Sequence, residues 1–258
     1  MTDVVLAEIW RYPVKSMRGE RLAEARLDTK LPGDRSFGVF DVESGHLLSG
    51  KTVPALLPMA ATWRDGEVNI TLADGRATSS TDSDVHTVLS EALGRAVELR
   101  RGVEGESATV AIELDDGEGD DDAERPFFEF PTRDNGSFFD GSSAIHIIAR
   151  ATLDALEAVG DEGAGDIRRY RPNLVVAGCE AFAEDAWVDR TVTVSDARIF
   201  VRKRTDRCVM VGRPQGDDLP RDRRILRHIV RNHESCVGVN CNPTTPGTLT
   251  EGAPITVT

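Results

Sequence analysis

The sequence predicts a mainly β protein of the α+β class, with a β-barrel domain, a smaller N-terminal β-barrel-like domain and a few short helices. Three observations predict this class. Short segments with period-two alternation recur along the 258 residues, and such segments are typical of strands. Only three segments show helical periodicity. An acidic run, residues 113–125, separates two strand-rich regions, so we expect domains at residues 1–112 and 126–258.

The first region predicts strands, hairpins and one helix. The stretch VVLAEIWRYPV alternates and predicts a strand, SFGVFDVESGHLL predicts a hairpin turning at Ser44–Gly45, and EVNITLADG predicts a strand ending in an Asp-Gly turn. SDVHTVLSEALG predicts a helix, with Ser83 or Asp84 as the N-cap and Gly94 as the stop. RAVELR then predicts a returning strand.

The acidic run ELDDGEGDDDAER has eight acidic residues among its thirteen and predicts a solvated linker. A metal-binding loop is the alternative, but the ligand spacing of an EF-hand is not present.

The second region begins at RPFFEF. SSAIHIIA and NLVVAG predict buried strands, TVTVSDARIFVRK predicts a hairpin around Ser195–Asp196, and GAPITVT predicts a closing strand. RATLDALEAVG predicts a helix that stops at Gly160. LPRDRRILRHIVRNH predicts an amphipathic helix with Ile225 and Ile229 on its apolar side.

The charge composition indicates an acidic cytoplasmic protein. Net charge is -13, and only four of the 31 cations are lysines. A high-salt cytosol favours such a surface, and a GC-rich genome is the alternative explanation. We expect no nucleic-acid partner, because the phosphate backbone requires a basic face. No signal peptide or long apolar run is visible, so we expect no membrane association. Four irregularly spaced cysteines do not indicate a disulfide scaffold and favour a reducing compartment.

Cys208 follows a segment with four cations, Arg202, Lys203, Arg204 and Arg207. Nearby cations lower the pKa of a thiol and favour the thiolate, which is the nucleophile and the metal ligand. Alternate strand residues face opposite ways, so only some of these cations can lie beside the sulfur. The alternative is a small buried residue beside a solvated basic strand.

Further cations lie in turns at strand ends. Their positions are Arg11, Lys15, Arg18, Arg35, Arg168, Arg169 and Arg171. If these turns converge with the Cys208 segment, they form a site for a phosphorylated anion, because arginine offers paired donors. The alternative for each is an ordinary solvated turn.

A zinc site is a rival hypothesis near the C-terminus. His228, His233, Cys236 and Cys241 lie within fourteen residues, but their spacings match no standard structural zinc pattern. Packing roles are favoured for these four side chains. His46, His86 and His146 are isolated, and we assign no role to them.

Five motifs carry a resemblance to a known family. In chain order they are YPVKSMRGE, LPGDRSF, FFDGSSAIHII, RYRPNLVVAGCEAFAEDAW and RCVMV. They resemble the molybdenum-cofactor sulfurase C-terminal family, known as MOSC, with its N-terminal β-barrel partner domain, over nearly the whole chain. The nearest relatives in pattern are the amidoxime-reducing, N-hydroxylated-substrate reductases and their bacterial counterparts.

The resemblance implies that Cys208 is catalytic and binds molybdenum through its thiolate, a soft ligand suited to a metal beside a pterin dithiolene. It implies that a second catalytic residue, Asp140, orients an oxygen atom or a proton donor. The implied cofactor-binding residues are Lys15, Ser16, Arg35, Ser142, Arg171, Asn173 and Arg207. Pyridoxal phosphate binding is a further family-level alternative.

The resemblance implies a molybdenum-cofactor oxidoreductase that reduces N-hydroxylated or related N–O substrates. The cysteines do not supply a C-x4-C-x2-C ferredoxin pattern, so we expect electrons from a separate ferredoxin, flavin or cytochrome protein. Asp206 replaces a serine common in the family, and VGRPQGDDLP replaces the usual turn after the cysteine. One alternative is a non-catalytic carrier of the cofactor, or of sulfur as a Cys208 persulfide. A metal-free interaction module is the third hypothesis.

Overall fold

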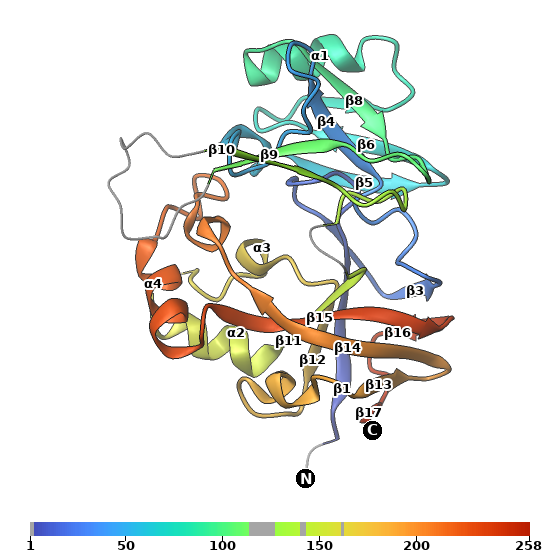
Figure 1. Cartoon of the computed structure of the whole chain (residues 1–258), viewed down its shortest axis with the longest axis vertical. Helices are drawn as coiled ribbons and strands as arrows, with labels where there is room; N and C mark the ends of the chain where they lie inside the picture. The colour runs from blue at the N-terminus through green and yellow to red at the C-terminus, as the bar shows by residue number, and fades with distance from the viewer. Residues whose placement is uncertain (1–2, 114–126, 140–142, 161–162) are drawn as a thin grey trace.

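The computed structural model describes residues 3–113, 127–139, 143–160 and 163–258. Figure 1 shows two parts stacked along the long axis. We call them the lower unit, formed mainly by residues 5–27 and 143–258, and the upper unit, formed mainly by residues 37–138. Strands dominate both, which confirms the predicted α+β class.

An eight-stranded sheet forms the lower unit, in the order β17-β13-β14-β15-β11-β12-β1-β2. The strands are β1 (Val5–Arg11), β2 (Glu20–Leu22), β11 (Ile145–Ala149), β12 (Leu174–Ala177), β13 (Thr191–Val194), β14 (Ala197–Asp206), β15 (Cys236–Thr245) and β17 (Ile255–Val257). Neighbours are antiparallel except β11 and β12, which are parallel. A separate pair is β3 (Glu24–Leu27) with β16 (Gly247–Thr250).

Hydrogen bonds between the two ends of the chain close this sheet on itself. Leu6 N donates to Ala253 O at 2.9 Å, and Ile255 N donates to Val4 O at 2.8 Å. Because β1 lies near one end of the strand order and β17 at the other, these bonds join the two sheet edges and make a barrel.

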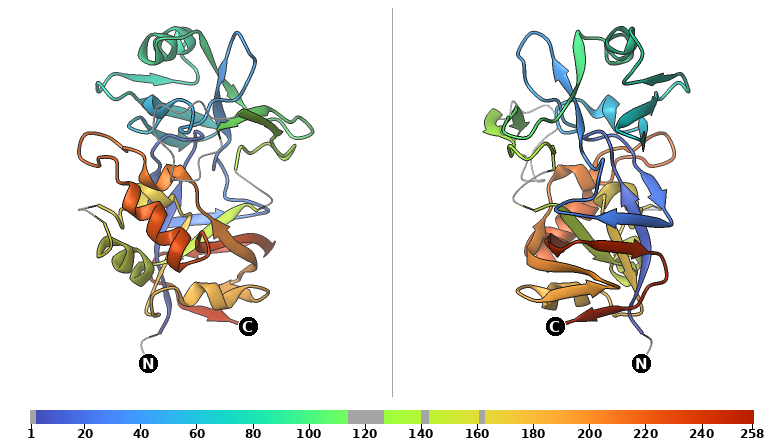
Figure 2. Two further views of the ribbon diagram at one scale, coloured as in Figure 1. Left: turned by 60° about the vertical axis from the view of Figure 1, so that its left-hand side comes forward. Right: turned by 90° about the vertical axis from the view of Figure 1, so that its right-hand side faces the viewer.

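Strands β11 and β12 of the lower unit are buried on both faces. Ile147 and Leu174 point into the barrel, whereas Ile148 and Val175 pack against helices on the outside. This follows from period-two alternation in strands that are apolar throughout. The outer elements are α2 (Arg150–Glu157), α3 (Ile167–Tyr170), the 3-10 helices η2 (Ala183–Trp187) and η3 (Val209–Gly212), and α4 (Arg223–Asn232). Figure 2 shows α2 and α4 together on one side of the barrel.

The upper unit contains small antiparallel sheets and one helix around its own apolar core. Its elements are β4 (Phe37–Asp41), η1 (Pro54–Leu56), β5 (Ala60–Arg64), β6 (Glu67–Thr71), β7 (Ala77–Ser79), α1 (Val85–Leu93), β8 (Val97–Arg101), β9 (Thr109–Glu113) and β10 (Phe127–Pro131). Helix α1 has Asp84 at its N-cap and ends at Gly94, whose φ is +64°, as the sequence predicts.

The predicted division of the chain into residues 1–112, 113–125 and 126–258 stays a prediction. Two strands pair outside their own predicted segment. Strand β1, from the first segment, pairs with β12 in the lower barrel. Strand β10, from the last segment, pairs with β9, and Phe138 packs with Phe40 in the upper unit. Most of the predicted acidic linker lies outside the described residues.

The longest helix in the described parts of the chain, α4, has ten residues. A membrane crossing needs about 20 residues, so none of the described helices is long and apolar enough to span a bilayer.

Candidate cofactor-binding site

Strand β1 carries the chain from the lower barrel to the upper unit, and the candidate site lies where it passes between them. Val14 bridges to Phe37 in the upper unit, and Lys15 N donates to Phe37 O at 2.9 Å. The residues that follow β1 are therefore placed beside the turns that precede β4 and β12. Sequence reasoning predicted several of its cations at those turns.

Arg35 lies in the turn before β4 with a positive φ of +47°. Its guanidinium donates to Asp34 Oδ2 at 2.6 Å, to Asn173 Oδ1 at 3.3 Å and to Arg171 O at 3.1 Å. The latter two acceptors belong to the lower unit. Arg35 therefore joins the two units with charge-assisted hydrogen bonds.

Arg171 reaches the same place from the lower unit. It caps α3 in the left-handed conformation, with φ +52°, and its guanidinium donates to Met17 O at 2.6 Å. The guanidinium carbons of Arg35 and Arg171 each lie 4.5 Å from the centroid of the Tyr12 ring. Two arginines that are distant in sequence therefore contact one aromatic ring.

Lys15 and Ser16 complete this group. Lys15 is buried, at 5% exposure, and its Nζ donates to Phe138 O at 3.1 Å. Ser16 has φ +70°, and its Oγ accepts a hydrogen bond from Gly50 N at 2.8 Å. We call Lys15, Arg35 and Arg171 the cationic cluster.

Cys208 is a free, partly exposed thiol in the residue before η3. The turn around it is closed by Arg207 N donating to Ser235 O at 2.7 Å and Val211 N donating to Cys208 O at 3.2 Å. Burial raises the pKa of the Cys179, Cys236 and Cys241 thiols, which favours their protonated forms.

Contacts on two sides place the Cys208 turn beside the cationic cluster. On one side, the Arg207 guanidinium donates to Tyr170 O at 3.1 Å, next to Arg171 in the chain. On the other, a Cβ added to Gly50 would lie 2.9 Å from Met210 Cε, so η3 packs closely on the loop that donates to Ser16. These contacts place the backbone of the Cys208 turn next to the loops of Arg171 and Ser16, and the predicted convergence of the side chains on one anion site stays a prediction.

Arg207 is held by the protein rather than directed outward. Its guanidinium donates to Val237 O at 2.6 Å and to Tyr170 O, and its Nη2 lies 2.6 Å from His146 Nε2. Burial lowers the pKa of Arg207 to about 10. The predicted role of Arg207 in cofactor binding stays a prediction, and its observed contacts brace the backbone around Cys208.

Asn173 is fully buried and also acts as a brace. Its Oδ1 accepts from Arg35 and from His146 N at 3.2 Å, and its Nδ2 donates to Trp10 O at 3.2 Å. Asp140 and Ser142, the other predicted site residues, lie outside the described residues.

Two of the remaining cations before Cys208, Lys203 and Arg204, face other partners. Lys203 pairs with Asp206 at 2.5 Å, and Arg204 pairs with Asp185 and Glu234, each at 3.1 Å. The hydrogen bond from Lys203 lowers the pKa of Asp206. The expectation that only some of the four cations lie beside the sulfur agrees with these contacts.

Two residues of the site were missed by sequence reasoning. His146 is buried in β11, and its pKa lies well below 6.5 because of burial and the nearby charges of Arg207 and Arg35. Tyr12 lies between the two arginines, and burial raises its pKa. The available signal for His146 was a titratable residue inside an otherwise apolar strand.

Two buried hydroxyls of this region test whether the residues fit a phosphorylated cofactor. Tyr12 Oη and Ser49 Oγ have no hydrogen-bond partner among the described residues. Ser49 precedes Gly50, the donor to Ser16. Buried polar atoms normally have partners, and phosphate oxygens supply acceptors. The donors and the cationic cluster therefore fit an anionic group beside the thiol.

The rival zinc site does not form. The rings of His228 and His233 lie 5.3 Å apart, and His233 stacks on Phe182 at 4.0 Å. Cys241 is fully buried in the barrel core. No group of three or more potential ligands that could hold a metal occurs within the described ranges.

The fold and the site define a class: a mainly β protein of two units in which the turn of a partly exposed cysteine lies beside a cationic cluster whose Lys15 and Arg35 are buried. The chain belongs to the MOSC family, since residues 132–256 match the MOSC domain and residues 3–106 match the MOSC N-terminal beta barrel domain. This family is associated with molybdenum cofactor binding.

One curated relative is the mitochondrial amidoxime reducing component 2 of Bos taurus, which is 28% identical over 200 residues. The match covers 70% of this chain and 59% of the relative, so the chain spans about three fifths of that protein.

Among solved structures, the YUAD protein of Bacillus subtilis has a TM-score of 0.47 and 11% identity, with 100% of this chain and 98% of that chain covered. YiiM of Geobacillus stearothermophilus has a TM-score of 0.33 and 17% identity, with 45% and 54% covered.

Proposed function

We propose that the chain is a molybdenum-cofactor oxidoreductase that reduces N-hydroxylated or related N–O compounds. One observation carries the proposal. Arg35, from the turn before β4 in the upper unit, and Arg171, from the end of α3 in the lower unit, meet beside the turn that contains Cys208. The family membership and the similarity to an amidoxime reducing component support the choice of cofactor and substrate class.

Different residues of the site would hold different parts of the cofactor. Cys208 would hold molybdenum as a thiolate, because a soft sulfur ligand suits this metal. Lys15, Ser16, Arg35 and Arg171 would hold the phosphate and pterin. The cofactor supplies the two-electron redox chemistry when it is bound. Its phosphate brings negative charge that the cationic cluster offsets inside an otherwise acidic chain.

The tests of cofactor and reaction are separate. Protein purified from its host is analysed for molybdenum and pterin, and an N-hydroxylated benzamidine is then offered with reduced methyl viologen as the donor. The proposal requires both bound metal and formation of the amidine. Metal without turnover contradicts the enzymatic assignment and favours a carrier of the cofactor.

A sulfur-carrier function is the second candidate, and the partial exposure of the Cys208 thiol favours it. A persulfide needs a sulfur that a donor enzyme can reach. Mass spectrometry of the intact protein distinguishes the two, because sulfane sulfur on Cys208 without molybdenum supports the carrier.

A further inference from the structure

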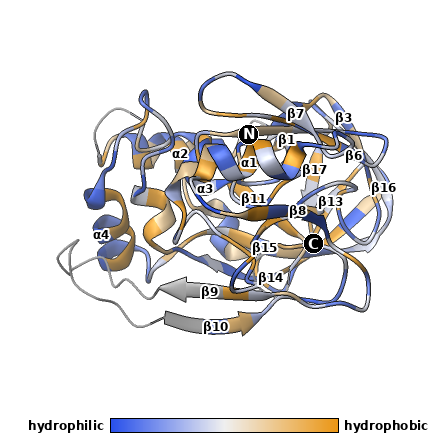
Figure 3. Cartoon of the chain, turned by 90° about the horizontal axis from the view of Figure 1, so that it is seen from above, coloured by the Kyte–Doolittle hydropathy of each residue, from blue (hydrophilic) through white to orange (hydrophobic). Residues whose placement is uncertain are grey.

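The outward side of α4 carries positive charge only. Its sequence, RRILRHIVRN, contains four arginines and no acidic residue. The buried residues of the helix are Ile225, Leu226 and Ile229. Arg224, Arg227 and Arg231 are exposed on the opposite side, at spacings of three and four residues that place them in one stripe. Figure 3 shows α4 at the margin of the molecule.

The stability of the helix accounts for only part of this stripe, because Arg231 alone lies in the last turn, where the helix dipole favours a cation. Arg227 and Arg231 are like charges four residues apart, which destabilises an isolated helix. Arg223 and Arg224 stand in the first turn, where the helix dipole disfavours cations. Asp222, the N-cap, offsets part of this effect by pairing with Arg224 at 3.0 Å.

The arginines furthest along the helix are available to a partner. In the parts of the chain that the structure describes, Arg227 and Arg231 form no ion pair or hydrogen bond through their guanidinium groups. Val230 lies between them in sequence and is 42% exposed. Exposed apolar side chains flanked by arginine are typical of protein interfaces.

The surrounding segment has the opposite charge from the chain as a whole. Residues 202–231 contain ten lysine and arginine residues against four acidic ones, in a protein of net charge -13. The field of this region therefore attracts acidic macromolecules that the rest of the surface repels.

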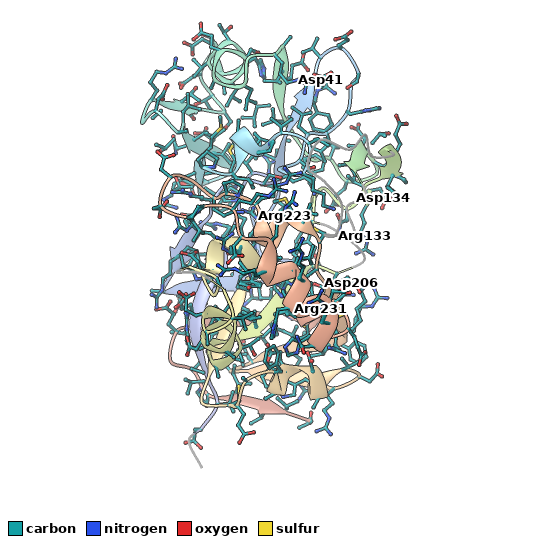
Figure 4. The ribbon with its side chains drawn as sticks, turned by 90° about the vertical axis from the view of Figure 1, so that its left-hand side faces the viewer. Asp41, Arg133, Asp134, Asp206, Arg223 and Arg231 are labelled. Carbon is teal, nitrogen blue, oxygen red and sulfur yellow. The ribbon has the colours of Figure 1, made fainter. Side chains whose placement is uncertain are left out.

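The stripe is attached rigidly to the turn of Cys208. Asp222 N donates to Gly212 O at 3.0 Å, which ties the start of α4 to the end of η3. Val211 of η3 is buried in the same apolar core as the inner side of α4. Arg169 also bonds both segments, at Val211 O and Pro220 O. Figure 4 shows Arg223 and Arg231 along α4 on one face of the molecule.

We propose that the outer side of α4 is the docking surface for an acidic electron-donor protein. Donor carboxylates pair with Arg227 and Arg231, and an apolar contact covers Val230. This inference rests on the proposed function, which consumes electrons: breaking the N–O bond takes an electron pair from the donor and a pair of protons, and releases water. Arginine suits the contact because its paired donors match a carboxylate at short range, where salt screens least.

The test uses the full chain and, as the probe, a purified acidic [2Fe–2S] ferredoxin. Its Kd is measured by isothermal titration at about 0.1 M salt, where exposed charges still act over roughly 10 Å. The double variant Arg227→Glu/Arg231→Glu is expected to bind about ten-fold more weakly or worse. The matched control is Arg26→Glu/Arg198→Glu, which makes the same change in net charge at exposed positions. Both control positions lie on strands that pair with the segment 245–248. The Kd of this control variant should stay within about two-fold of the wild-type value.

Two further measurements separate the inference from the proposed function. Turnover with reduced methyl viologen should be the same in the α4 variant as in the wild type. If the wild type shows no turnover, the proposed function fails, and the titration still tests whether α4 is the docking surface. A wild type that does not bind the ferredoxin, or a variant that binds equally well, overturns the docking proposal. Tighter binding of duplex DNA or anionic vesicles, lost in the same variant, also overturns it.

Discussion

His146 is a neutral base held between cations. Its Nε2 lies 2.6 Å from Arg207 Nη2, and the ring is buried. A protonated imidazole could not accept that hydrogen bond, so the low pKa of His146 and the orientation of Arg207 support one another. Arg207 in turn precedes Cys208, so His146 helps to fix the backbone that presents the thiol.

Stability should depend on pH through His146. The folded pKa lies well below 6.5, so the unfolded chain binds the proton more readily. The stabilisation by neutral His146 is therefore present above the unfolded pKa and is lost as pH falls through the folded pKa. Between these values the free energy of unfolding should fall by up to about 1.4 kcal/mol per pH unit from this group.

Urea unfolding at about pH 7.5 and pH 5.5 checks this dependence against the variant His146→Gln. Glutamine can accept from Arg207 but cannot take up a proton, so the variant should lose less stability on acidification. Identical losses in the two proteins would show that His146 does not titrate as its surroundings require.

At the scale of elements, β15 leaves space for the His146 ring by having glycine at position 238. Gly238 has φ +71°, and an added Cβ would lie 2.5 Å from His146 Nε2 and 2.8 Å from Ile147 O. A side chain there meets both a strained backbone and a closed space.

The variant Gly238→Ala should be destabilised by about 1–3 kcal/mol more than Gly45→Ala. The control has nearly the same φ, +70°, and nothing within 4 Å of the added Cβ, so the backbone penalty is shared and only the clash differs. Thermal or urea unfolding of both variants gives the difference. Equal losses would mean that the ring can move without penalty.

The N-cap of α4 should contribute more than that of α1. Asp222 accepts a hydrogen bond from Arg224 N at 2.9 Å, whereas Asp84 makes no side-chain cap bond. Asp222→Ala should reduce the free energy of unfolding by about 1–2 kcal/mol, because it loses a cap and a partly buried ion pair. Asp84→Ala is the control, expected to change it by less than about 0.5 kcal/mol. A comparable loss in the control would remove the cap as the cause.

At the scale of the molecule, local patterns predicted the elements but not all of their partners. Alternation identified β1, a run of apolar residues identified β11 as a buried strand, and an N-cap followed by a stop identified α1. The closure of the barrel by residues 4–6 and 252–255 has no local signal, because it joins the two ends of the chain. The same holds for β10, which pairs with β9 across the acidic run.

The residues of the candidate site were also predicted only in part. Cations in glycine- and proline-punctuated turns indicated Arg35 and Arg171, since such turns lie at strand ends. Arg204 was indistinguishable from them in sequence, because its partners, Asp185 and Glu234, are distant along the chain. His146 stood out in the sequence only as a titratable residue in an apolar strand, and its role could not be predicted because its partner, Arg207, is 61 residues away.

The account depends on the Cys208 thiol and the cationic cluster acting as one site. The most direct measurement is the molybdenum and pterin content of three proteins purified from the same host: the wild type, Cys208→Ser and the control Cys179→Ser. We predict nearly one molybdenum per wild-type and control chain, and loss of at least about nine tenths of the metal in Cys208→Ser. Metal retained in Cys208→Ser, or metal absent from all three proteins, would contradict the assignment of this thiol as the molybdenum ligand.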